Sequence, residues 1–162
     1  MATLVAPEPD LSFPTLGPAI VDLIQERCTF GPGSLQGQPA VLDDQKLGAL
    51  YTFYEVYPRG HRLAGRRVHP RCSIEWVKGL AKTELAAWIA FAEFHPEGPV
   101  RCDGFDAYGR PVGRPVVAPY IPMMATAEEQ VERLAFGVLY FVIEHSPDAD
   151  LFDLGLKRIL RK

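Results

Sequence analysis

Several features that would assign this chain to a special class are missing from its 162 residues. No run of about 18 apolar residues exists, so no membrane-spanning helix is expected. The first ten residues, MATLVAPEPD, lack a basic flank and carry two prolines, which is not the pattern of a signal peptide. The net charge of −3 argues against a protein whose whole surface binds polyanions.

Cysteine is scarce, and its spacing excludes the common metal patterns. Cys28, Cys72 and Cys102 stand far apart, and none forms a C-x-x-C pair. Zinc ligands usually come in close pairs, so no zinc site is predicted. Buried free thiols in a reducing cytosol are the simpler interpretation.

Composition is otherwise that of one globular domain, with 48% hydrophobic and 23% charged residues. Proline and glycine are frequent, at 15 and 14 residues, which indicates many loops. We divide the chain into a Pro/Gly-rich helix and loop over residues 1–40 and a main domain over 41–162. Proline is absent from 71–95 and 123–146, where regular structure is safest.

Helices are predicted where apolar residues recur at helical spacing behind a start signal. The residues expected to begin them are Pro18, Asp43 as a cap, and Thr126 in the capping box Thr126-Ala-Glu-Glu129. The predicted helices are Pro18–Arg27, Asp44–Tyr57, Lys82–Phe94 and a last one from Thr126 to Glu144.

Two strands are predicted, Cys72–Val77 and Ile121–Ala125, each followed by a helix. This order is typical of an α/β domain with parallel strands, so we expect a three-layer sandwich. Between Pro99 and Pro122 the turn signals predict loops and a hairpin. The tail, 146–162, is expected to form a turn or short strand near Leu151.

Positive charge is concentrated in one stretch. Residues 59–71 hold five arginines and two histidines, and 56–82 carries seven basic residues against one glutamate, a net of +6. The rest of the chain is therefore −9. Two interpretations remain open: a side that faces phosphates, or a solvated loop whose arginines pair with neighbouring carboxylates.

The turn between the first predicted strand and its helix has the residues of a phosphate-binding loop. Such a loop needs inward-facing amides, a lysine for the phosphate charge and a hydroxyl for magnesium. Lys82 and Thr83 supply the last two, and Gly79 allows a tight turn. In the pattern G-x-x-x-x-G-K-[ST], however, the glycine positions hold Trp76 and Ala81. The alternative is an ordinary capped helix after a strand.

The chain resembles the large terminase subunit of tailed bacteriophages, especially those that infect actinobacteria. Segments carrying the resemblance run in order along nearly the whole chain. They are Thr15-Leu-Gly-Pro18, Gly31-Pro-Gly33, Gly37-Gln-Pro39, Leu42-Asp-Asp-Gln45, Tyr54-Glu-Val-Tyr-Pro-Arg-Gly-His-Arg-Leu-Ala-Gly-Arg-Arg67, Lys78-Gly-Leu-Ala-Lys-Thr-Glu84, Ala86-Ala-Trp-Ile-Ala-Phe-Ala-Glu93, Pro119-Tyr-Ile-Pro122 and Ala125-Thr-Ala-Glu-Glu-Gln130.

The resemblance implies an incomplete P-loop NTPase of the RecA-like kind, the N-terminal ATPase portion of a DNA-packaging motor whose nuclease domain lies beyond it. It implies ATP and Mg²⁺ as cofactors, with Thr83 on the metal and Gln45 at the adenine. The implied phosphate loop consists of Lys78, Gly79, Leu80, Ala81, Lys82 and Thr83. The implied partners are the small terminase subunit, the portal and viral double-stranded DNA. Further copies of the chain would join only at full length, in the cytoplasm of a bacterial host.

One expected element of such an ATPase is not visible. The magnesium and the attacking water need an acidic pair after an apolar strand. The nearest match, Leu139–Glu144, is followed by His145 and falls within a predicted helix. We therefore expect the chain not to be catalytically complete by itself. The alternatives are a non-catalytic remnant or interaction protein with a degenerate loop, and a small phosphoryl-transfer enzyme.

Overall fold

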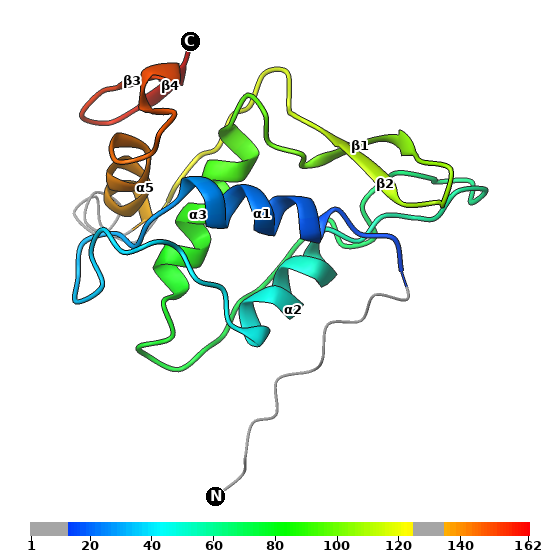
Figure 1. Ribbon diagram of the computed structural model, residues 1–162, viewed down its shortest axis with the longest axis horizontal. Coiled ribbons are helices and arrows are strands. Elements are labelled where there is room, and N and C mark those ends of the chain that lie inside the picture. The colour runs from blue at the N-terminus through cyan, green and yellow to red at the C-terminus, as the bar shows by residue number, and fades with distance from the viewer. Residues whose placement is uncertain (1–12, 125–134) are drawn as a thin grey trace, which may run out of the picture.

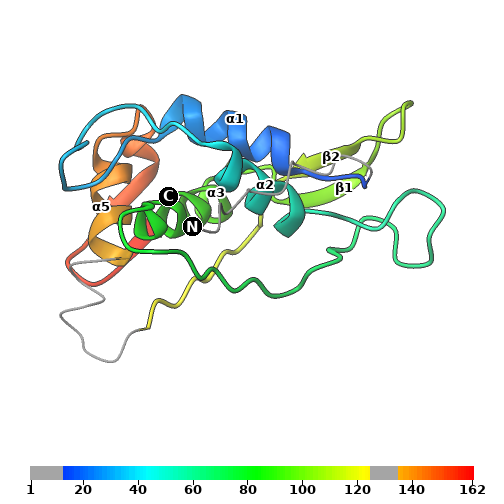
Figure 2. The same ribbon diagram turned by 90° about the horizontal axis from the view of Figure 1, so that it is seen from below.

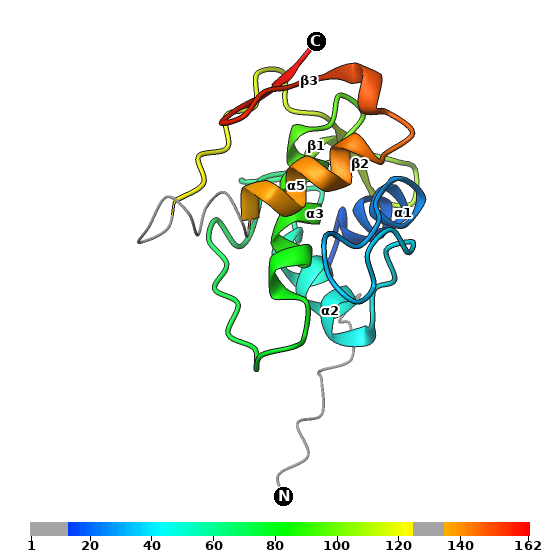
Figure 3. The ribbon, with the colours of Figure 1, turned by 90° about the vertical axis from the view of Figure 1, so that its left-hand side faces the viewer.

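Helices form the centre of the protein, which a computed structural model describes for residues 13–124 and 135–162. The helices of these residues are α1 (Gly17–Arg27), α2 (Asp44–Phe53), α3 (Lys82–Phe94) and α5 (Ala135–Glu144). In Figure 1, α3 runs through the middle, with α1 in front of it and α5 to one side. Figure 3 shows α5 lying across α3, and the two helices are in contact.

The first two helices begin where the sequence predicts. Pro18 lies in the first turn of α1, and an apolar face that includes Ile20 and Ile24 is buried. The Asp43 carboxylate caps α2 by accepting a 3.0 Å hydrogen bond from the Lys46 amide. Lys46 also pairs with this carboxylate through its ammonium group.

The α2 helix ends at Phe53, four residues before the predicted Tyr57. Glu55 and Val56 instead form isolated antiparallel bridges to Thr15 and Arg67. Pairing with distant backbone therefore replaces the last predicted helical turn.

The α3 helix has the predicted bounds and carries the deepest part of the core. Leu85, Trp88 and Phe91 are fully buried, and the helix contacts both α1 and α5. It ends at Phe94, because the next residue, His95, precedes a proline and has an extended conformation.

Strands occur only at the periphery of the described residues. The predicted hairpin is confirmed: β1 (Arg101–Phe105) pairs antiparallel with β2 (Pro111–Arg114). Its turn is closed by Asp106, whose side chain accepts hydrogen bonds from the amides of Tyr108 and Arg110, each 2.9 Å. After a short 3-10 helix, Ala149–Leu151, the tail forms a second hairpin from β3 (Phe152–Leu154) and β4 (Ile159–Arg161).

The predicted three-layer sandwich with parallel central strands is wrong for the residues described. Their sheets are two separate antiparallel pairs. Cys72–Val77 and Ile121–Met124 are irregular, and Ala125 lies outside the described residues, as does the predicted helix start at 126–134. Figure 2 shows the segments around 71–77 and 117–124 on the same side of α3, with no strand drawn in either.

Burial explains why these segments looked like strands. Ile74 and Trp76 pack against the core, while Ser73, Glu75 and Val77 are exposed. The chain is thus extended with alternating faces, as in a strand. Its backbone, however, forms no hydrogen bonds with the backbone of another described segment. The alternation of apolar and polar residues indicates which face of the segment is buried. A sheet also requires a neighbouring strand.

A polar cluster with one fully buried member, His95, attaches the tail to the helices. Arg27, at the end of α1, donates two hydrogen bonds of 2.7 and 2.6 Å to the Asp148 carboxylate. The fully buried His95 has its Nε2 3.1 Å from Asp148 and its Nδ1 3.1 Å from the Glu97 amide. Because the amide must donate to Nδ1, Nε2 carries the proton of the neutral ring and donates to Asp148.

The prediction of buried free thiols is correct only in part. All three cysteines are free. Cys28 is buried, and burial, reinforced by the nearby Asp148 charge, raises the pKa of its thiol. Cys72, in contrast, is exposed, because it lies at the start of the unpaired segment before α3.

Candidate phosphate-binding site

The turn before α3 has an unusual backbone conformation. Gly79 has a φ of 96°, and Ala81 has φ 53° and ψ 41°, in the left-handed region. Among the described residues, Ala81 is the one non-glycine with a positive φ. It occupies the second glycine position of the phosphate-loop pattern, where glycine adopts this conformation at lower cost. The second glycine position thus holds an alanine in a conformation that favours glycine.

The end of this turn presents free amides. The first helical hydrogen bond of α3 is donated by Leu85 to the Ala81 carbonyl, at 3.0 Å. The amides of Lys82, Thr83 and Glu84 therefore have no partner within the helix, and Ala81 has no side chain that could cap them. Unpaired amides and the helix dipole make this end of α3 electropositive.

Two lysines add full positive charge. The exposed Lys82 donates a hydrogen bond from Nζ to the main-chain carbonyl of Trp76. Lys78 is exposed and has no ion-pair partner among the residues described. Thr83, in the first turn of α3, is half-buried and carries a hydroxyl.

The turn forms one wall of a cavity of about 380 Å³. That wall is Lys78–Glu84, the whole of the predicted phosphate loop with Glu84 added. Opposite it lies the loop that follows α1. Its lining residues are Phe30, Gly31, Gly33, Ser34 and Leu35. The charged lining residues are two lysines and one glutamate, so the cavity is net positive.

The opposite wall is the part of the site that sequence reasoning missed. Gly31-Pro-Gly33 predicted only a loop there, although the same residues belong to the resemblance. In Figures 1 and 2 the loop after α1 and the turn before α3 lie on the same side of the molecule. About 45 residues separate the two walls along the chain, so no local sequence pattern could predict that they lie close together in space.

Gln45 does not reach this cavity. It is half-buried on α2 and is absent from the lining residues. The neighbouring Lys46 has its ammonium 5.8 Å from the centre of the Trp76 ring, so α2 lies beside the segment that leads into the turn. The predicted contact between Gln45 and adenine stays a prediction.

Among the described residues that line the cavity, Glu84 is the one acidic residue. The run ending at Glu144 lies within α5, as predicted, and Glu144 is exposed at its end. No group of three or more histidine, cysteine, aspartate or glutamate residues within 13–124 and 135–162 could hold a metal ion.

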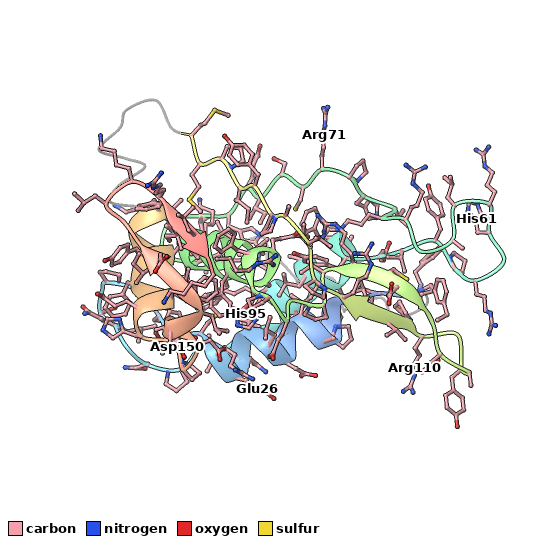
Figure 4. The ribbon with its side chains drawn as sticks, turned by 90° about the horizontal axis from the view of Figure 1, so that it is seen from above. Glu26, His61, Arg71, His95, Arg110 and Asp150 are labelled. Carbon is pink, nitrogen blue, oxygen red and sulfur yellow. The ribbon has the colours of Figure 1, made fainter. Side chains whose placement is uncertain are left out.

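In the basic stretch 59–71, pairing with a neighbouring carboxylate is found for one of the five arginines, and the phosphate-facing interpretation stays a prediction. Arg67 pairs with Glu93 and lies 4.3 Å from the centre of the Tyr54 ring, so this arginine is structural. The other four arginines are exposed and pair with no carboxylate in the described part of the chain. Figure 4 shows Arg71 pointing away from the helices, whereas the ring of His61 stacks on that of Tyr57, with centroids 4.5 Å apart.

Comparison of the chain with protein-family models, with curated proteins and with solved structures finds no match. Among the described residues, no helix has the length and apolar character needed to cross a membrane. The resemblance to the terminase large subunit therefore rests on the sequence segments alone.

Proposed function

We propose that this chain binds the phosphates of ATP, with Mg²⁺, at the turn 78–83, as the ATP-binding portion of a phage DNA-packaging motor. The proposal combines two kinds of support. One is the order of the sequence segments that resemble the terminase large subunit. The other is the local geometry of the turn and does not depend on a parallel sheet.

One observation carries the proposal: the left-handed backbone at Ala81, immediately before Lys82 begins α3. A helix whose preceding residue is left-handed turns its first amides toward the loop, where they can surround an anion. An ordinary capped helix would have a capping side chain and an extended preceding residue instead. The backbone at Ala81 fits a phosphate loop better than that alternative.

The side chains of the turn fit the chemistry of a magnesium nucleotide. Lys82 would exchange the Trp76 carbonyl for phosphate oxygens and would act as a point charge. Thr83 would offer its hydroxyl to the metal, and Lys78 would add charge at the rim. Bound magnesium would screen the negative charge between the phosphates.

The implied setting follows from the resemblance. The partners would be the small terminase subunit, the portal and viral double-stranded DNA, in the cytoplasm of a bacterial host. Assembly into a homo-oligomer would require the full-length subunit.

A second candidate, a non-catalytic interaction protein with a degenerate loop, is favoured by one observation. The Ala81 methyl group stands where the backbone of a phosphate loop approaches its ligand closely. A small phosphoryl-transfer enzyme, the third candidate, has no observation in its favour, because Glu84 is the one acidic residue among the described residues that line the cavity.

Titration with a fluorescent ATP analogue and magnesium tests the proposal. Lys82→Ala is expected to weaken binding about tenfold or more, because a charge-assisted hydrogen bond is lost. Lys162→Ala removes the same charge from the exposed C-terminal residue and is the matched control. Thr83→Val should reduce mainly the magnesium-dependent part of the affinity. Equal affinity of wild type and Lys82→Ala, or no saturation at millimolar nucleotide, contradicts the proposal.

A further inference from the structure

The wall opposite the phosphate turn is a loop held shut at its base. We define it as the 28–40 loop, with 33–36 as its tip. The Ala40 amide donates to the Cys28 carbonyl at 3.0 Å, and Phe30 exchanges backbone hydrogen bonds of 2.9 and 3.0 Å with Gln38 and Gly37. The tip is closed further by the amide of Gln36, which donates to Gly33 at 3.2 Å. The loop therefore has a defined shape of its own.

Helix α3 fixes this loop relative to the phosphate turn. The indole of Trp88 donates a 3.0 Å hydrogen bond to the Thr29 carbonyl, and its ring meets Phe30 edge to face, with centroids 5.1 Å apart. Trp88 is six residues beyond Lys82, or about 9 Å along the helix axis. One rigid helix thus begins at one wall of the cavity and holds the base of the other.

A second helix supports the loop from behind. Gly31 lies so close to α5 that a Cβ atom built on it would be 2.7 Å from Cγ1 of Val138. The loop is thus held against α3 and α5 at its base, while Ser34 and Leu35 at the tip remain exposed at the cavity.

The two walls differ in chemistry. The phosphate turn offers amides and lysines, whereas the 28–40 loop has no charged residue and offers the aromatic ring of Phe30, the apolar side chain of Leu35 and the hydroxyl of Ser34. Leu35 is 44% exposed, although it is a large apolar residue. An exposed apolar side chain beside a hydroxyl suits the flat face of a base and the hydroxyls of a ribose, not a phosphate.

We infer that the tip of the 28–40 loop binds the nucleoside part of the nucleotide, and that the site thereby prefers ATP to an inorganic polyphosphate. This inference rests on the proposed function, because it takes the opposite wall as the phosphate subsite. The cavity volume of about 380 Å³ lies within the range of roughly 300–1,000 Å³ typical of small-molecule sites. The tip of the 28–40 loop would contact the nucleoside within this cavity, whereas Gln45 is not among the lining residues.

Competition between two ligands separates the two walls. The protein is titrated with a fluorescent ATP analogue, and then magnesium ATP or magnesium tripolyphosphate is used to displace it. The double variant Ser34→Ala/Leu35→Ala is expected to bind ATP about five- to tenfold more weakly than the wild type. Its affinity for tripolyphosphate should be unchanged. Gln36→Ala, an exposed change in the same tip outside the cavity lining, should alter neither ligand.

Lys82→Ala distinguishes failure of this inference from failure of the proposed function. Lys82→Ala should weaken the binding of both ligands, because both carry phosphates. If Ser34→Ala/Leu35→Ala leaves ATP unchanged while Lys82→Ala weakens it, the nucleoside wall is wrong and the phosphate turn stands. Equal weakening of both ligands by Ser34→Ala/Leu35→Ala also overturns the inference. If the wild type binds neither ligand, the proposed function fails and the nucleoside wall with it.

Discussion

The ammonium group of Lys82 reaches back across the turn that precedes its helix and donates a hydrogen bond to the main-chain carbonyl of Trp76. A phosphate in the turn would compete with that carbonyl for the same charge. The lysine thus has a partner in the ligand-free chain that a ligand can replace, and its exposure permits the exchange.

We predict that the chain by itself hydrolyses ATP negligibly. Positioning and charge neutralisation supply nearly all of the catalysis of phosphoryl transfer, and among the described residues Glu84 is the one acidic residue that lines the cavity at the turn. Steady-state phosphate release from the pure protein should match that of Lys82→Ala. A rate clearly above that control would contradict the prediction.

Ala81 provides a prediction about backbone strain. A left-handed residue other than glycine costs roughly 1–2 kcal/mol, and glycine in the unfolded chain costs about 0.4–1 kcal/mol in entropy. Ala81→Gly should therefore raise the free energy of unfolding by between about 0 and 1.6 kcal/mol while tightening nucleotide binding. Ala81→Val should destabilise by at least about 1 kcal/mol, because a β-branched residue is a true outlier there.

Urea unfolding and nucleotide titration of both variants test this account of the turn. An Ala81→Val variant as stable as wild type would show that the turn is not left-handed. An Ala81→Gly variant with unchanged nucleotide affinity would show that the alanine methyl group does not crowd the phosphate.

The contact between Gly31 and Val138 predicts a coupled pair. Gly31→Ala should lower the free energy of unfolding by roughly 1–3 kcal/mol, because its methyl group would overlap Cγ1 of Val138. Adding Val138→Ala removes the overlapping atom. The double variant should therefore lose about 1 kcal/mol less unfolding free energy than the two single variants lose together. Strict additivity in urea unfolding would refute the close approach of α5 to the 28–40 loop.

His95 predicts the direction of the pH dependence of stability. Burial lowers the pKa of His95, and the Asp148 carboxylate opposes this shift without cancelling it. The unfolded state therefore binds a proton more readily, so stability falls as the pH drops below about 6.5. The slope due to this group is at most about 1.4 kcal/mol per pH unit.

His95→Gln keeps a side-chain donor toward Asp148 but does not titrate. Its unfolding free energy between pH 7 and 5 should depend less on pH than that of the wild type. Equal slopes for the two proteins would contradict the assignment of a neutral, buried His95.

Local signals in the sequence predicted the helices well, because caps and apolar spacing act within a few residues. Asp43 caps α2, and α3 has the predicted bounds of Lys82–Phe94. The hairpin after Pro99 also followed from its turn residues. Where a distant partner decided the structure, the prediction failed: α2 ends early because Glu55 and Val56 pair with other segments.

The absence of a sheet at 72–77 and one wall of the cavity could not be predicted from the sequence, because both depend on distant partners. Alternation at Ile74 and Trp76 correctly indicated which side chains are buried, but it cannot show whether a neighbouring strand is present. Likewise, the spacing of Lys82 and Thr83 located one wall of the cavity, whereas Ser34 and Leu35 reach it only through the packing of Trp88 and Val138.

The measurement that tests the central claim most directly is amide NMR of the labelled chain during titration with magnesium ATP. We predict saturable shifts centred on the amides of 79–84, with smaller shifts at 33–35 and none at the hairpin turn 106–110. The same titration of Lys82→Ala should require about tenfold more nucleotide. Absence of saturable shifts at 79–84, or shifts centred instead on the exposed arginines of 59–71, would contradict a phosphate site at the start of α3.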